Sequence, residues 1–159
     1  HAGAIMAKDL DALEYPIRRS CEIKAEVVAE DEREQGRRAI LNYGHTFGHA
    51  IESVTHYTRF LHGEAVALGM CAAGALAREL GMVDDEFVAR QRDCCVAYGL
   101  PVTFAELPVA EAVAAMRKDK KVRAGTLKFV LAKGMGEVTF RTDITEDQAG
   151  AAFETLRGN

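Results

Sequence analysis

The chain has no excess of positive charge and no long apolar run. Its 159 residues include 20 Lys and Arg against 24 Asp and Glu, which gives a net charge of −4. Proteins that bind nucleic acid need a basic excess or a basic stripe to displace counterions, so this charge argues against a nucleic-acid partner. No stretch reaches about 18 consecutive apolar residues, so we expect no transmembrane helix and no membrane partner.

A secretory signal and paired cysteine motifs are also missing. The opening HAGAIMAKDLD has no basic segment followed by a long apolar one, which favours a cytoplasmic location. No two cysteines have the CxxC spacing of metal or redox motifs. We therefore expect all four to be reduced, small and buried hydrophobic residues: Cys21, Cys71, Cys94 and Cys95.

Several catalytic signatures are absent as well. The sequence has no G-x-S-x-G elbow, no G-x-G-x-x-G turn and no Walker A loop, so it carries no recognisable nucleotide fingerprint of its own. His45 and His49 have the spacing of a zinc protease pair. Thr46, however, stands where the H-E-x-x-H motif needs its Glu, which argues against a protease.

The sequence does have the composition of one soluble globular domain. Apolar residues make up 48% and charged residues 28%, and no repeat or low-complexity linker interrupts the chain. We predict a single, mainly α-helical, bundle-like domain over residues 1–159 with one small β-hairpin. The predicted helices cover residues 16–30, 38–55, 63–80, 84–98, 108–117 and 145–158, and the predicted strands cover 126–131 and 137–142.

Residues that favour helix ends support most of these boundaries. Pro16 suits a first helical position, and Gly36 is the expected break in the charged segment that follows the first helix. Asp84 is a natural N-cap, and Gly81 is a C-cap signal for the segment 63–80. That segment is apolar nearly all round, so we expect it to be central and buried.

One face of the predicted helix 38–55 carries most of the residues with chemical potential. At 100° per residue, five polar side chains fall within roughly an 80° arc: Arg38, Asn42, His45, His49 and Glu52. A merely solvated face carries Lys–Glu pairs more often, and two histidines four residues apart have the spacing of metal ligands or anion-binding groups. The alternative is a helix with incidental histidines.

Glycines and a third histidine strengthen this interpretation. Gly44 and Gly48 each cost about 1 kcal/mol relative to Ala inside a helix, which indicates that another backbone or a ligand comes close. His62 precedes the buried helix 63–80, where helix N–H groups attract anions, although it could instead be a capping or core-edge residue. Glu64 is more typical of a first-turn dipole partner than of a metal ligand.

Two further basic features can serve the same site or only face solvent. Lys24 lies on the first predicted helix and can project toward the histidines, or it can be an ordinary surface lysine. The RKDKK segment at residues 117–121 can clamp a phosphate or carboxylate, or it can be a solvated turn.

Three segments in this order resemble the C-terminal domain of 3-dehydroquinate synthases. They are KAEVVAEDEREQGRRAILNYGHTFGHAIE, then LHGEAVALGM, then MRKDKK followed by a Gly and an FVL strand. The resemblance extends from about Tyr15 to the C-terminus, and the pair GHTFGHAIE and HGEAVALGM is highly specific. Iron-type alcohol and glycerol dehydrogenases share the architecture with a looser histidine pattern. Other sugar-phosphate cyclases, such as 2-deoxy-scyllo-inosose synthase, are nearer relatives.

The resemblance implies a metal site. It implies that His45 and His62 bind a divalent metal, zinc or cobalt, and that the His49 side chain contacts the substrate near its phosphate. The third metal ligand of the family is a Glu in a G-x-A-E-x-x-K-Y motif, which this sequence does not contain. The assignment requires the three imidazole rings to converge on a common point.

The resemblance also implies a set of residues around the substrate. It makes His49, Lys24 and Asn42 catalytic residues, and it gives Arg38 and Lys120 to substrate binding. Lys24, Arg38 and Asn42 would contact hydroxyl and carboxylate groups, whereas Lys120 would reach the phosphate.

The activity that the resemblance implies is that of a longer enzyme. This NAD- and metal-dependent lyase of the shikimate pathway, which leads to chorismate and aromatic amino acids, converts 3-deoxy-D-arabino-heptulosonate 7-phosphate to 3-dehydroquinate and phosphate. We expect an N-terminal domain, absent from these residues, to bind most of the NAD, and a cytoplasmic homodimer as the full-length form. The 159 residues alone should be inactive and bind metal weakly, because a catalytic zinc site wants three protein ligands.

Two alternatives stay open at this point. Another sugar-phosphate cyclase would have a similar site, but a glucose 6-phosphate cyclase has no substrate carboxylate for Arg38 to hold. A non-catalytic helical interaction module with incidental histidines is the alternative from a different class of function.

Overall fold

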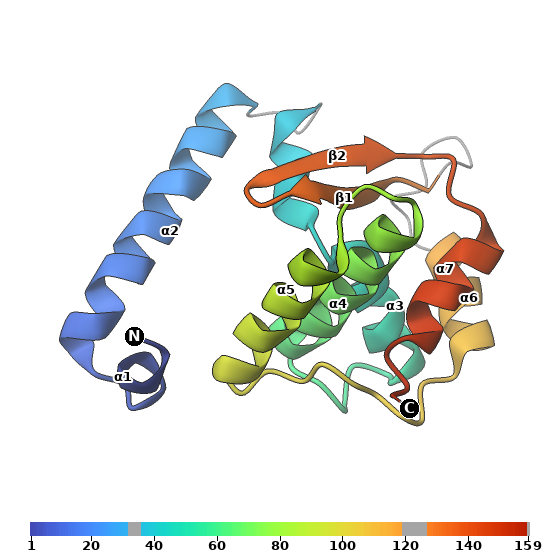
Figure 1. Ribbon diagram of the computed structural model, residues 1–159, viewed down its shortest axis with the longest axis horizontal. Helices are drawn as coiled ribbons and strands as arrows, with labels where there is room; N and C mark the ends of the chain where they lie inside the picture. The colour runs from blue at the N-terminus through green and yellow to red at the C-terminus, as the bar shows by residue number, and fades with distance from the viewer. Residues whose placement is uncertain (32–35, 119–126, 159) are drawn as a thin grey trace. The chain divides into compact units, whose positions relative to one another are not determined.

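The computed structural model describes residues 1–31, 36–118 and 127–158 (Figure 1). In chain order the elements are α1 (Ala2–Met6), α2 (Leu10–Glu30), the 3₁₀ helix η1 (Arg37–Asn42), α3 (His45–Val54), α4 (His62–Glu79), α5 (Asp85–Ala97), α6 (Val109–Lys118), β1 (Phe129–Gly134), β2 (Glu137–Arg141) and α7 (Glu146–Glu154). The mainly α-helical class with one small hairpin is therefore confirmed. The chain divides into two compact units, His1–Leu41 and Asn42–Asn159.

The long helix α2 of the first unit begins earlier than predicted. Its N-cap is Asp9, whose carboxylate accepts a hydrogen bond from the Ala12 backbone N–H at 3.0 Å, so the helix starts at Leu10. Pro16 consequently lies inside the helix rather than at its first position, and that prediction was wrong. The Asp9 cap provides an acceptor for a free N–H group of the first turn. Pro16 has no backbone N–H, so the Ala12 carbonyl oxygen lacks the hydrogen bond that residue 16 would otherwise donate.

Asp31 contacts the backbone at the start of the segment that contains η1. Asp31 follows the last residue of α2, and its carboxylate accepts hydrogen bonds from the backbone N–H groups of Gly36 at 2.8 Å and Arg38 at 3.0 Å. One acidic side chain therefore ties the end of α2 to the start of η1.

The predicted continuous helix 38–55 is wrong, because the chain forms two helices there. The 3₁₀ helix η1 ends at Asn42 and α3 begins at His45. Between them Gly44 has a φ of 81°, a left-handed conformation that glycine adopts at little cost. Arg38 and Asn42 therefore lie on η1, whereas His45 and His49 lie on α3.

Helix α4 is the centre of the second unit, as predicted (Figure 1). Twelve of its residues are buried, and α3, α5, α7 and β1 all pack against it. Many of its side chains are Ala or Gly, which lets neighbouring elements come close. The largest fully buried side chains of the surrounding core are Phe47, Phe129, Phe153, Ile51, Leu68, Leu76, Leu131 and Leu156.

The remaining helix ends follow the predicted capping residues closely. Asp84 caps α5 by accepting a hydrogen bond from the Phe87 N–H at 2.8 Å, and Gly81 follows α4 with a φ of 66°. Thr145 and Gln148 form the expected capping box of α7, although that helix ends at Glu154, short of the predicted residue 158.

The hairpin pairs β1 and β2 antiparallel, with Val130 opposite Phe140. The tight turn has Gly136 at a φ of 78°, and the first strand begins at Phe129, later than predicted. The register shifts between Ala132 and Gly134, where a bulge ends the regular pairing.

The cysteines agree with the prediction only in part. All four are free, and Cys71 and Cys95 are buried between α4 and α5. Cys21 and Cys94 are exposed, so the expectation of burial was wrong for those two. Cys94 is exposed because α5 buries only the helix face that contains Cys95. Among the described residues, no helix combines the length and apolar character that crossing a bilayer requires.

Candidate metal and substrate site

Helices α3 and α4 cross with their backbones in contact at three glycines. A Cβ atom on Gly69 would lie 2.0 Å from the Gly44 carbonyl oxygen and 2.7 Å from the Gly48 nitrogen. A Cβ on Gly48 would in turn meet the Ala65 carbonyl oxygen at 3.1 Å. This confirms that another backbone approaches Gly44 and Gly48. The pairing runs antiparallel, so the end of α3 lies beside the start of α4.

The crossing brings three imidazole rings together. The ring centroids lie 5.5 Å apart for His45 and His49, 5.3 Å for His45 and His62, and 5.9 Å for His49 and His62. Two rings come from successive turns of α3, and the third comes from the first residue of α4. The convergence on which the sequence assignment depends is therefore present.

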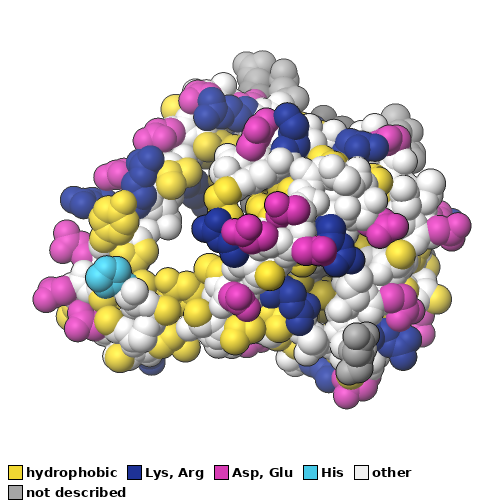
Figure 2. Space-filling view, in the orientation of Figure 1, with side chains coloured by type: hydrophobic (Ala, Val, Ile, Leu, Met, Phe, Trp, Pro, Cys, Tyr) yellow, Lys and Arg dark blue, Asp and Glu magenta, His cyan; other side chains and the backbone are white. Residues whose placement is uncertain are grey.

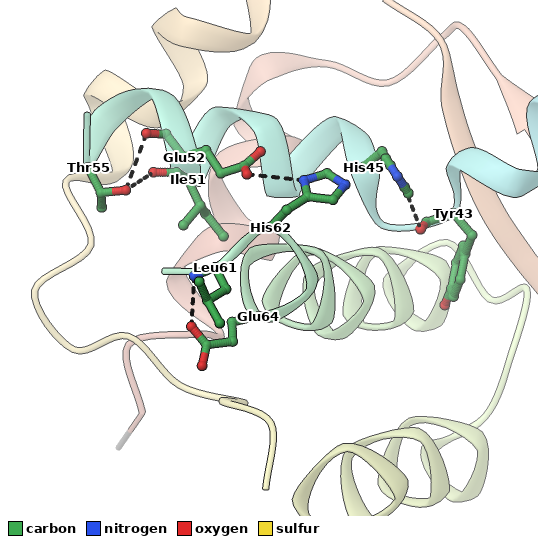
Figure 3. Close-up of polar contacts among 8 residues, drawn as sticks. All are labelled: Tyr43, His45, Ile51, Glu52, Thr55, Leu61, His62 and Glu64. Carbon is green, nitrogen blue, oxygen red and sulfur yellow. Dashed lines mark hydrogen bonds and ion pairs between the residues drawn. The ribbon is translucent and has the colours of Figure 1, made fainter. Parts of the chain in front are cut away.

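Two of these rings have one nitrogen bonded to an oxygen acceptor (Figure 3). His62 Nδ1 lies 3.1 Å from Glu52 Oε1, and His45 Nδ1 lies 3.3 Å from the Tyr43 carbonyl oxygen. A donor bond at Nδ1 selects the tautomer whose lone pair is on Nε2. Histidines that ligate metals usually have this arrangement, with the second nitrogen hydrogen-bonded to a carboxylate or a backbone carbonyl.

Glu52 is the acidic member of the site, and sequence reasoning gave it no role. It is 6% exposed and is the one buried charged side chain among the residues that the structure describes. Ligand atoms of His49, Glu52 and His62 all lie within 4.8 Å of one another, which is close enough for a divalent ion. Its place in the polar stripe, three residues after His49, was the signal that could have identified it.

A cavity of about 540 Å³ opens beside these side chains. Its polar lining includes His49, Glu52 and Ser53 of α3 and His62 at the start of α4. Met116 of α6 and Leu127 form part of an apolar wall. A space of this size with a polar and an apolar side suits a small polar ligand.

Glu64 does not belong to the site. Its Oε2 atom accepts a hydrogen bond from the Leu61 backbone N–H at 2.8 Å, at the start of α4 (Figure 3). The carboxylate therefore satisfies a free donor of the first turn. This confirms the interpretation of Glu64 as a first-turn partner rather than a metal ligand.

The other predicted site residues lie on different elements of the chain. Lys24 is exposed on α2 and Arg38 is half-buried on η1, both in the first unit, and Asn42 is the first residue of the second unit. Lys120 lies outside the described residues. Arg117, at the start of the predicted basic cluster, forms an ion pair with Glu146 in the first turn of α7.

Comparison with known proteins gives one consistent family. The family model described as "3-dehydroquinate synthase C-terminal" matches residues 1–122. The 3-dehydroquinate synthase of Acidithiobacillus ferrooxidans is 46% identical over 144 residues, and that of Shewanella halifaxensis is 46% identical over 145 residues. Each alignment covers 91% of this chain but only 40% of the relative, so the chain spans less than half the length of these relatives.

Two solved structures share the fold. The 2-epi-5-epi-valiolone synthase of Streptomyces hygroscopicus subsp. jinggangensis, with NAD⁺ and Zn²⁺ bound, matches with a TM-score of 0.83 and 26% identity, over 98% of this chain and 44% of that one. A 2-deoxy-scyllo-inosose synthase complexed with carbaglucose-6-phosphate, NAD⁺ and Co²⁺ matches with a TM-score of 0.78 and 22% identity, over 92% of this chain and 41% of that one.

Proposed function

Since this chain belongs to the 3-dehydroquinate synthase C-terminal family, we propose that it is the metal- and substrate-binding part of such an enzyme. The reaction is the conversion of 3-deoxy-D-arabino-heptulosonate 7-phosphate to 3-dehydroquinate and phosphate, in the shikimate pathway. The parent enzyme is a lyase that depends on NAD and on a divalent metal, and the greater part of the NAD site lies in the parent outside these residues. A homodimeric parent and a cytoplasmic location remain predictions.

One observation carries this proposal. Three imidazole rings meet at the α3–α4 crossing with centroids 5.3 to 5.9 Å apart, and His45 and His62 each have an oxygen acceptor at Nδ1. A helix with incidental histidines has no reason to bring in a third ring from another helix.

The residues present fit a zinc or cobalt ion. His45 and His62 would hold the ion through Nε2. In each ring the hydrogen is on Nδ1, where it is bonded to an oxygen acceptor, so the lone pair for the metal is on Nε2. Imidazole suits both metals, and a bound ion would act as a Lewis acid toward a hydroxyl or ketone of the substrate. With two such ligands in this chain, we expect weak binding.

The other predicted residues would bind and orient the substrate. His49 lines the cavity and would contact the substrate near its phosphate. Lys24 and Asn42 would hold hydroxyl groups, Arg38 the carboxylate and Lys120 the phosphate. Fixing both anionic ends of a small substrate lowers the entropic cost of reaching the reactive geometry. NAD, when bound, supplies reversible hydride transfer.

Metal titration of the 159-residue chain tests the site. Zn²⁺ affinity, measured by competition with a chromophoric chelator, should fall at least about tenfold in His45→Ala and in His62→Ala, because each removes one of two ligands. His49→Ala should change it much less. His56→Asn is the matched control, since His56 is exposed and has a φ of 53°, which asparagine tolerates. Unchanged affinity in both alanine variants would favour the non-catalytic module instead.

The competing proposal is that the parent is another sugar-phosphate cyclase, such as a 2-deoxy-scyllo-inosose synthase. A 2-epi-5-epi-valiolone synthase shares this fold with a TM-score of 0.83, so the fold is compatible with either activity. Turnover of 3-deoxy-D-arabino-heptulosonate 7-phosphate and of glucose 6-phosphate by the full-length parent separates the two, because only the first substrate has a carboxylate for Arg38. Preference for glucose 6-phosphate would contradict the synthase assignment. The 159-residue chain supplied with NAD and metal should turn over neither substrate.

A further inference from the structure

Glu52 combines features that a solvated or structural carboxylate rarely has. It is 6% exposed, whereas the His62 side chain that it touches is 58% exposed. Burying a carboxylate is unfavourable unless hydrogen bonds or an opposite charge compensate for the lost water. The bond from Oε1 to His62 Nδ1 at 3.1 Å is such a compensation, so the carboxylate and the ring depend on each other.

The fold places Glu52 opposite His62 by a chain of close contacts. Gly44 and Gly48 of α3 meet Gly69 and Ala65 of α4, and one further turn along α3 brings Glu52 to the first residue of α4. The backbone carbonyl of Glu52 also accepts the Tyr57 N–H at 2.8 Å, which holds the end of α3 in place. The position of the carboxylate is therefore set by the backbone.

The orientation of the His62 ring shows what this contact does. Figure 3 shows one ring nitrogen directed at Glu52 and the other directed toward His45. An ion shared by His45 and His62 would thus lie on the side of the His62 ring away from Glu52.

We propose that Glu52 is a positioning residue, which holds the His62 ring so that Nε2 faces the metal position. This inference rests on the proposed metal site. The carboxylate accepts the Nδ1 hydrogen, fixes the tautomer and makes Nε2 a stronger donor toward the ion. It also restrains a side chain that is otherwise largely in solvent.

A competing role for Glu52 is direct ligation. His49, Glu52 and His62 are near enough to bind an ion together. In that case His49→Ala would weaken metal binding as much as His62→Ala does, and His45→Ala would not. If Glu52 instead positions His62, His45→Ala should weaken metal binding strongly and His49→Ala should weaken it little.

The experiment uses Zn²⁺ and Co²⁺ alone as probes of the 159-residue chain. Glu52→Ala should lower Zn²⁺ affinity about 10- to 100-fold, the usual loss when such an outer hydrogen bond to a ligating histidine is removed. Glu52→Gln should lose less, because its amide oxygen can still accept the Nδ1 hydrogen. Glu64→Gln is the matched control: it removes a charge two residues from His62 without touching the ring, and should stay within twofold.

The Co²⁺ absorption spectrum separates positioning from ligation. The visible bands of the Glu52→Gln chain should keep the wild-type pattern, since the ligand atoms are unchanged. Bands that change in Glu52→Gln, or wild-type affinity in Glu52→Ala, would overturn the inference. The Gln side chain has nearly the same shape as Glu, so Glu52→Gln still tests the inference if the Glu52→Ala chain does not fold. Failure of His45→Ala and His62→Ala to weaken binding would instead reject the metal site itself.

Discussion

The two long faces of α4 pack against their neighbours in different ways. Toward α3 the contact is backbone on backbone, with a Cβ on Gly69 only 2.0 Å from the Gly44 carbonyl oxygen. Toward α5 the contact is made by side chains, and a Cβ on Gly74 would meet Gln91 Nε2 at 2.8 Å. Backbone cannot move aside without moving a helix, whereas a side chain can change rotamer.

The side chains on the α5 face form a small, partly buried polar network beside the core. Gln91 Nε2 donates to the Met70 carbonyl oxygen at 2.6 Å, and Gln91 Oε1 accepts from the Tyr43 hydroxyl at 2.6 Å. Beside them a hydrogen bond to the Cys95 sulfur, together with burial, raises the pKa of Cys71. The face that positions the histidines thus relies on close backbone contact, and the opposite face relies on adjustable side-chain bonds.

The strongest test of this difference is Gly69→Ala. The added methyl group meets the backbone of α3, so we expect the chain to lose at least about 3 kcal/mol of unfolding free energy or to fail to fold. Urea denaturation followed by circular dichroism measures the loss. Gly63→Ala, on the same helix with no atom within 4 Å of its Cβ, is the matched control and should be neutral or stabilising. Equal effects of the two substitutions would refute the close crossing.

The same contrast explains what the sequence could predict. The segment 63–80 was assigned correctly because an all-round apolar pattern followed by Gly81 has one simple interpretation, a buried helix with a C-cap. The segment 38–55 was assigned wrongly because the polar stripe continues through Gly44 without interruption. Nothing local in the sequence says that Gly44 is left-handed, and the atoms that a Cβ on Gly44 would meet belong to Met70 and Val66 of α4.

The site was predicted in part for a related reason. His45, His49 and His62 follow from spacing and motif, and their convergence is confirmed by the ring distances. The polar stripe places Glu52 near the histidines, but its partner does not follow from the sequence, because that depends on which residue the end of α3 meets. A carboxylate on an amphipathic helix gives no sign in the sequence that it is 6% exposed.

Gly74→Ala tests the adjustable face and should have a smaller effect. The methyl group gains helix propensity but displaces a Gln91 amide that is bonded at both ends, so we expect a net loss of about 1 kcal/mol. Chemical denaturation of a double-mutant cycle with Gln91→Ala identifies the cause. If Gln91 is responsible, Gly74→Ala becomes neutral or stabilising in the Gln91→Ala background. The same loss in both backgrounds would mean that backbone, and not Gln91, limits this face.

The smallest effect is expected at alkaline pH, through Tyr43 at the edge of the same network. Burial raises the pKa of Tyr43, so the folded chain keeps the phenol proton at a pH where the unfolded chain has lost it. Ionisation of this phenol should leave the unfolding free energy unaffected below about pH 10 and lower it above that pH, by up to about 1.4 kcal/mol per pH unit. Denaturant midpoints between pH 9 and 10.5 measure this slope, and the loss from Tyr43 at pH 10.5 should be about 0.8 kcal/mol. Tyr43→Phe should remove the Tyr43 contribution to the fall of unfolding free energy with pH. Tyr57→Phe, which removes an exposed hydroxyl, should leave that fall unchanged. If Tyr43→Phe left the slope above pH 10 unchanged, groups other than Tyr43 would be responsible for the loss of stability there.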